Sequence, residues 1–126
     1  MVKELSQSTI DIVINTADMV VSNSSKITKS MYAILFDKYP HVQSLFINQP
    51  ENQYMILSEA LSLFAVNIDK LDKLTPALNR IATIHVRTNV KAGHYPMVGM
   101  ALLSAMEDVL TNRATVKFID AWREVY

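Results

Sequence analysis

Metal chemistry in this chain would depend on histidine or carboxylate ligands, because the sequence contains no cysteine. Among its histidines, His85 closes an apolar stripe that includes Leu78 and Ile81 at helical spacing. A neutral imidazole in that position can bind a metal ion, but it can equally be a hydrogen-bonded residue of the core. We interpret His41, which has polar neighbours, and His94, which begins a predicted helix, as surface residues. His85 is therefore the histidine that we consider as a metal ligand.

Two further side chains could donate hydrogen bonds to a small ligand that acquires negative charge. Tyr32 offers a phenol O–H, and Gln53 offers an amide N–H. Taken alone, Tyr32 is typical of a half-buried aromatic residue, and Gln53 is typical of a solvated helix residue. Phe46 would by itself be an ordinary core residue. The residue types alone leave these alternatives open.

The elements that must position these side chains are all predicted to be helical. The first part of the chain predicts a helix over about 10–21 capped by Ser8, a helix over 27–39 capped by Ser24 or Ser25, and a short turn over 40–46. The second part predicts a helix over about 50–68, a helix that begins at Thr75 and Pro76 and contains His85, a helix over 95–109, and a last helix from about 112. No stretch shows the period-two alternation of a strand. The predicted class is all-α.

Length and charge exclude several classes of function. The 126 residues fit a single domain, 1–126. Twelve basic residues balance twelve acidic ones, so no net field attracts nucleic acid or an anionic membrane surface. No stretch approaches the roughly 18 apolar residues of a membrane span. We expect a cytoplasmic protein with no nucleic-acid or membrane partner.

Around His85 the sequence reads IATIHVRTNVKAGHYPMVGMALL, residues 81–103. This phrase resembles the proximal segment of flavohaemoglobins and single-domain bacterial haemoglobins, in which a histidine near a helix end binds haem iron. His85 takes the place of that histidine. Tyr95, followed by Val98 and Gly99, matches the tyrosine and the short apolar phrase that come after the corner in this family.

A second phrase, MYAILFDKYPHVQSLF at residues 31–46, resembles the distal helix and the short proline-started helix of the same family. Tyr32 takes the place of the distal tyrosine, and Phe46 that of the phenylalanine that stacks on the haem. Counting back from AVNI, residues 65–68, puts Gln53 at the distal glutamine and Leu57 one turn later. The resemblance covers nearly the whole chain.

The resemblance implies a globin fold, with helices packed around a haem pocket and a short last helix. It implies a non-covalent haem b, because the Cys-x-x-Cys-His signal of covalent attachment is absent. His85 would ligate the iron, while Tyr32 and Gln53 would act on the bound gas. The residues implied to contact haem are Phe46, Leu57, Ile81, His85, Val90, Tyr95 and Val98.

Two functions follow from this resemblance. In the first, the protein binds O2, nitric oxide and carbon monoxide, and it detoxifies nitric oxide by dioxygenation to nitrate with a separate reductase. In the second, it is a reversible O2 carrier, store or gas sensor without turnover. A haem-free helical interaction domain, the third possibility, would leave His85 and Tyr32 without a role.

The sequence departs from the family pattern at its end. It stops at Tyr126 without the Gly-rich loop of a reductase module, so we expect an external electron donor. It also stops before the glutamate that joins the proximal histidine and tyrosine in family members. Because such groups orient the imidazole and set its basicity, we expect a weaker electron push and a more loosely held haem. We expect a monomer or a weak dimer.

Overall fold

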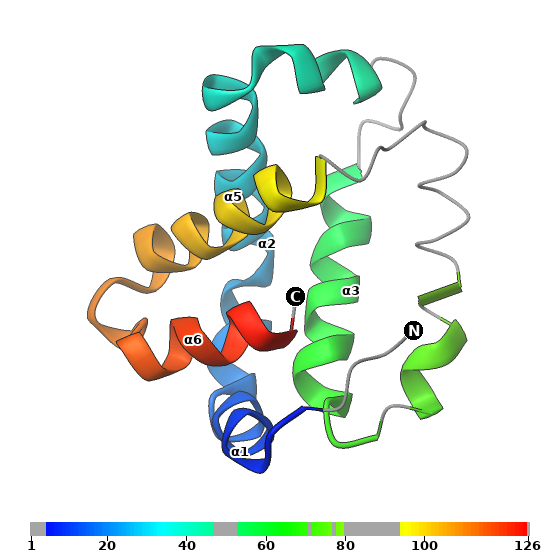
Figure 1. Ribbon diagram of the computed structural model, residues 1–126, viewed down its shortest axis with the longest axis vertical. Helices are drawn as coiled ribbons and strands as arrows, with labels where there is room; N and C mark the ends of the chain where they lie inside the picture. Colours follow the sequence, from blue (N-terminus) through cyan, green and yellow to red (C-terminus); the bar gives the residue numbers. More distant parts are fainter. Residues whose placement is uncertain (1–4, 47–52, 71, 77, 80–93, 126) are drawn as a thin grey trace.

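The computed structural model describes residues 5–46, 53–70, 72–76, 78–79 and 94–125. Its elements are α1 (Gln7–Asn15), α2 (Ala17–Lys38), the 3₁₀ helix η1 (Pro40–Phe46), α3 (Gln53–Asn67), α5 (His94–Leu110), the 3₁₀ helix η2 (Thr111–Arg113) and α6 (Val116–Val125). All regular structure in these ranges is helical, which confirms the all-α class. In Figure 1, α5 and α6 cross in front of α2, and α3 stands beside them. None of the described helices combines the length and apolarity that a membrane crossing requires.

The first helix boundary differs from the sequence prediction, because Ser6 and not Ser8 caps α1. The Ser6 hydroxyl accepts a hydrogen bond from the Thr9 amide at 3.2 Å. The chain then bends at Thr16, whose φ is −111°, and α2 continues for 22 residues. The helix break predicted at Ser24 and Ser25 is therefore wrong. Ser24 is buried inside α2, where its hydroxyl donates to the Val21 carbonyl at 3.1 Å. This bond satisfies the hydroxyl within the helix, away from any helix end.

The helix predicted to begin at Thr75 and Pro76 also begins earlier than expected. Helical conformation is already present at Asp72 and extends over 72–76. Leu74 is buried to 1% exposure, so the apolar burial of this turn outweighs the local start signal of Thr75 and Pro76. Tertiary packing decides this boundary.

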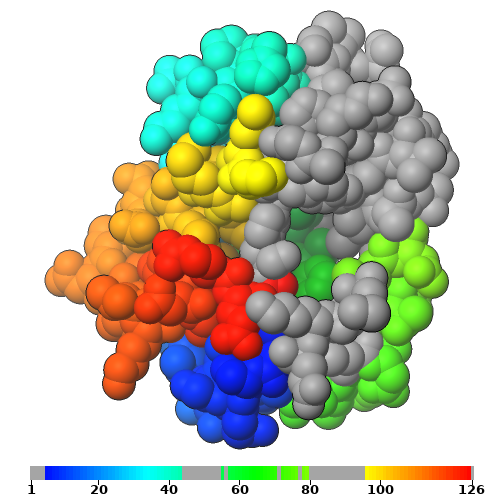
Figure 2. Space-filling view, in the orientation of Figure 1, coloured from blue at the N-terminus to red at the C-terminus, as the bar shows by residue number. Residues whose placement is uncertain are grey.

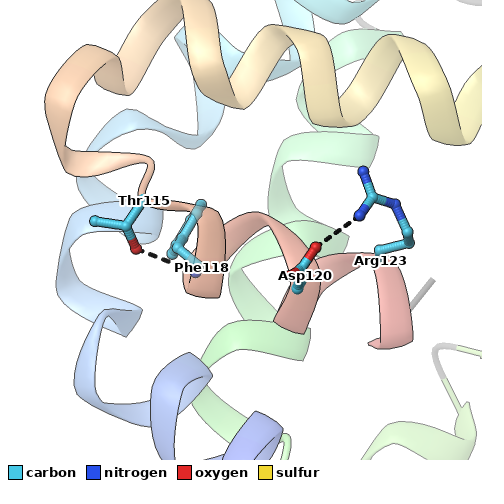
Figure 3. Close-up of polar contacts among 4 residues, drawn as sticks. All are labelled: Thr115, Phe118, Asp120 and Arg123. Atoms are coloured by element: carbon cyan, nitrogen blue, oxygen red, sulfur yellow. Dashed lines mark hydrogen bonds and ion pairs between the residues drawn. The ribbon is translucent and has the colours of Figure 1, made fainter.

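Proline marks the other boundaries much as predicted. Pro40 ends α2 and begins η1, and α5 begins at His94, two residues before Pro96. The last helix begins at Val116 and not near Asn112, because Thr111–Arg113 form η2. The Thr115 hydroxyl accepts from the Phe118 amide at 3.2 Å and so satisfies a donor of the first turn of α6 (Figure 3).

The core is organised around α2, which contacts α3, α5 and η1, while α6 contacts α1 and α5. Three elements cover the buried face of α2. The apolar side chains of that face recur at helical spacing. The most deeply buried apolar residues of this core include Val20, Ile27, Met31, Leu35, Ala101, Ala105, Met106, Leu110, Phe118 and Trp122. Full burial of one large apolar side chain contributes about 1.5–3 kcal/mol, so the side chains buried at this junction contribute strongly to the stability of the fold.

One carboxylate joins the two ends of the described chain. Glu124 of α6 accepts from the Ser6 amide at 2.8 Å, the Ser6 hydroxyl at 3.2 Å and the Thr9 hydroxyl at 2.6 Å. Its negative charge lies at the N-terminus of α1, where the helix dipole favours an anion. The sequence pattern predicted no such contact between α1 and α6.

Candidate functional site

Three of the predicted site residues have described side chains, and they come from three different helices. Tyr32 lies on α2, Leu57 on α3 and Val98 on α5. All three are half-buried and pack against the edge of the main core. Because α2 contacts both α3 and α5, the fold brings these helices together around one central element.

The ring of Tyr32 packs on Phe36, one turn later on α2. The ring centroids are 5.7 Å apart, and the ring planes are tilted by 33°. Residues four apart on a helix share a face, so this contact restricts where the phenol can lie. Sequence reasoning did not assign Phe36 to the site, although the four-residue spacing of the two aromatic residues was a signal for it.

A pair of serine hydroxyls joins α3 to α2. Ser58 of α3 donates to the Ser24 hydroxyl of α2 at 2.8 Å. One turn later on α2, Thr28 is fully buried, and its hydroxyl donates to the Ser24 carbonyl at 3.0 Å. Side chains of this size let two helix backbones come close together. This contact was not predicted, because Ser24 was expected to cap a helix.

The remaining predicted site residues are placed only in part. Phe46 is the last residue of η1, Gln53 is the first of α3 and Tyr95 is the second of α5. Of these three, only the backbone is described. The predictions for Ile81, His85 and Val90 lie outside the described residues. The assignment of His85 as a metal ligand therefore stays a prediction.

The described residues provide apolar and aromatic surface of the kind that a large apolar group such as haem requires. Half-buried apolar or aromatic side chains border the core from three helices: Tyr32, Phe36, Leu57, Phe64, Met97 and Val98. Figure 2 shows a hollow beside α6, with part of α3 visible at its base. The described part of the chain contains no cluster of three or more histidine, cysteine or acidic residues that could chelate a metal. A haem needs no such cluster, because the porphyrin already ligates the iron.

Comparison with known proteins identifies the family of this fold. The family model described as Globin matches residues 29–126. The chain belongs to the globin family. This membership confirms the resemblance on which the site prediction was based, and a globin typically holds haem iron through a proximal histidine.

Two relatives differ in how much of their length this chain covers. A globin-like protein from Aquifex aeolicus is 40% identical, over 97% of this chain and 86% of the relative. A flavohemoprotein from Oceanobacillus iheyensis is 35% identical over 97% of this chain. The chain spans only 31% of the length of that flavohemoprotein.

Solved structures confirm the globin fold. An engineered carbene transferase, a candidate nitric oxide dioxygenase from Rhodothermus marinus, matches with a TM-score of 0.93 and 36% identity, covering 98% of this chain and 86% of that one. A bacterial globin from Campylobacter jejuni matches with a TM-score of 0.85 and 28% identity, covering 96% of this chain and 88% of that one. The family and its flavohemoprotein relatives support the binding of haem and of gas ligands by this globin.

Proposed function

We propose that this globin binds one non-covalent haem b through His85 and oxidises nitric oxide to nitrate in the cytoplasm. When bound, the haem supplies a ferrous iron at which nitric oxide, O2 and one electron combine to give nitrate. A separate reductase would return that electron after each turnover. The observation that carries the proposal is Tyr32, a hydrogen-bond donor that stands half-buried among the apolar residues bordering the core.

Each proposed site residue has a distinct task. The imidazole of His85 would hold the iron, and Tyr95 would orient that imidazole. Tyr32 and Gln53 would donate hydrogen bonds to a ligand that gains negative charge, which stabilises it most in a pocket that excludes water. The side chains that would pack on the ring and exclude water are Phe46, Leu57, Ile81, Val90 and Val98.

Reversible binding of O2, for delivery, storage or sensing, is the second candidate function. The same donors would serve it, and no reductase would be needed. One observation favours this candidate: the chain covers 86% of the Aquifex aeolicus relative, which is described as globin-like, and only 31% of the Oceanobacillus iheyensis flavohemoprotein. Carbon monoxide and nitric oxide would bind to both kinds of protein.

Haem ligation can be tested with the full chain and two histidine variants. Binding of haem should quench the fluorescence of Trp122, the only tryptophan, and give a five-coordinate ferrous spectrum. His85→Ala should abolish that spectrum. His41→Ala changes an exposed histidine and should leave it intact. An unchanged spectrum in His85→Ala would overturn the ligand assignment.

The choice between turnover and reversible binding needs a separate experiment. Stopped-flow mixing of the oxygenated protein with nitric oxide should produce nitrate in stoichiometric amount. Addition of a reductase and its nicotinamide donor should then sustain many turnovers. If nitric oxide were consumed slowly, or if the reductase sustained no turnover, the protein would instead be a carrier or a sensor.

A further inference from the structure

The sulfur of Met100, on α5, lies against the phenol of Tyr39, the residue that follows α2. The Tyr39 hydroxyl donates a hydrogen bond to this sulfur, with the oxygen 4.0 Å from it. A thioether is a weak acceptor, so the bond is weak but directional. In the part of the chain that the structure describes, no other methionine sulfur accepts a hydrogen bond. Neither Tyr39 nor Met100 is among the predicted haem contacts.

The side chain of Met100 also lines a surface groove between α5 and α6, with a volume of about 440 Å³. Met100 and Leu103 are half-buried and form the apolar side of the groove. Ser104, Glu107 and Arg123 supply its polar groups. A small hydrophilic molecule can therefore reach the Met100 side chain while the protein stays folded.

The two contacts of Met100 make the two sides of its sulfur unlike. A thioether sulfur has two lone pairs, and addition of oxygen to one or the other gives two different epimers of methionine sulfoxide. The Tyr39 hydroxyl engages one of these lone pairs. The other lone pair is left for a reagent that arrives through the groove. Oxygen should therefore be added on one side only.

We propose that Met100 is a stereoselective oxidation site for hydroperoxides such as hydrogen peroxide, with Tyr39 as its positioning residue. The free lone pair of the sulfur attacks one peroxide oxygen, so that an S–O bond forms and the O–O bond breaks. The departing oxygen takes up the hydrogen that the transferred oxygen gives up, and it leaves as water. The sulfur loses two electrons and the peroxide gains them. This chemistry does not depend on the proposed reaction with nitric oxide.

A single epimer has a consequence for the reversal of the modification. Each of the two methionine sulfoxide reductases reduces one epimer of the sulfoxide. A uniform product at Met100 can thus be returned to the thioether by one of these enzymes alone. Oxidation also replaces an apolar side chain of the groove by a polar one. The groove therefore changes its polarity reversibly with the supply of peroxide.

The proposal can be tested by mapping the sulfoxides of the full chain. The protein is kept under carbon monoxide, which blocks a haem iron against peroxide, and is treated with hydrogen peroxide. After digestion, each half of the peptides is incubated with one of the two reductases and analysed by tandem mass spectrometry. One enzyme should remove about four-fifths or more of the sulfoxide at Met100. Met55, which is 48% exposed, is the internal control, and each enzyme should remove about half of its sulfoxide.

Two variants test the part played by the phenol. Tyr39→Phe keeps the ring and removes the O–H, so the epimer ratio at Met100 should fall from at least about fourfold to nearly even. His41→Ala is the matched control. It removes a ring that lies edge-on to Tyr39, with the centroids 6.2 Å apart, and it retains the phenol. The epimer ratio in this variant should stay as in the unchanged protein.

Three results would overturn the proposal. Met100 could remain unoxidised while Met55 is fully oxidised, in which case the groove gives peroxide no access to the sulfur. The unchanged protein could yield both epimers equally at Met100, in which case the oxidation is not stereoselective. Tyr39→Phe, folded normally by circular dichroism, could keep the full preference, in which case Tyr39 does not position the sulfur.

Discussion

Tyr32 is the proposed site residue whose role can be tested most directly. Its ring packs on Phe36, and its phenol is the donor that the proposed function requires. Tyr32→Phe keeps the ring and removes the O–H, so O2 dissociation should accelerate. A hydrogen bond to a charged or strongly polar ligand contributes about 1.5–3 kcal/mol, which corresponds to roughly one to two powers of ten in that rate.

The comparison with carbon monoxide separates hydrogen bonding from packing. Carbon monoxide gains less negative charge when bound, so its dissociation from Tyr32→Phe should change much less. Phe36→Leu is the matched control, because it alters the packing of the ring and retains the phenol. Flash photolysis and stopped-flow displacement measure both rates. Equal changes for the two gases in Tyr32→Phe would contradict the hydrogen-bond account.

At the scale of elements, the crossing of α2 and α3 depends on the size of Ser58. Ser58→Ala removes the hydrogen bond to Ser24 and should cost about 0.5–1.5 kcal/mol of unfolding free energy. Ser58→Val adds bulk between the two helices and should cost about 1–3 kcal/mol. Urea unfolding of the two variants measures the difference. If valine were no worse than alanine, the two helices would not be in close contact at this point.

Thr111 joins α5 to η2 with a left-handed backbone, since its φ is 53°. This region is unfavourable for every residue except glycine, and a β-branched residue is especially uncommon there. Thr111→Gly and Thr111→Ala both remove the hydroxyl that donates to the Leu110 carbonyl. Glycine should therefore give the higher unfolding free energy, by roughly 0.5–1 kcal/mol. In an ordinary helical position the alanine variant would be the more stable of the two. Thermal unfolding of both variants therefore shows whether the backbone of Thr111 is left-handed.

The elements that proline and apolar spacing define were predictable from the sequence. Pro40 and Pro96 act within their own segments, so η1 and α5 were placed almost correctly. The length of α2 was not predicted, because serine is a typical cap residue, whereas Ser24 lies buried inside α2 and accepts a hydrogen bond from Ser58 of another helix. Family resemblance placed Tyr32, Leu57 and Val98 on three separate helices, and local spacing alone left their roles open. Ser58 was missed because its role comes from a contact with another helix, whereas the spacing of Phe36 from Tyr32 on the same helix was a local signal that was overlooked.

At the scale of the whole molecule, Glu124 holds α1 against α6. Glu124→Gln keeps the shape of the side chain and removes its charge, so the hydrogen bonds from Ser6 and Thr9 should weaken. The loss should be about 1–2 kcal/mol, since bonds to a charged group contribute more than neutral ones. Lys117→Glu, on the exposed side of α6, should change stability by less than about 0.5 kcal/mol.

The same contact has a consequence for the order of folding. Ser6 and Glu124 are separated by 118 positions, so their contact closes nearly the whole chain into a loop. Closing so long a loop is entropically unfavourable until the contacts around α2 have already shortened it. We therefore expect this contact to form after the rate-limiting step. Glu124→Gln should accelerate unfolding and leave the refolding rate nearly unchanged in a denaturant-jump experiment. A slowed refolding rate would mean that α1 and α6 meet early, and that the chain folds from its ends inward.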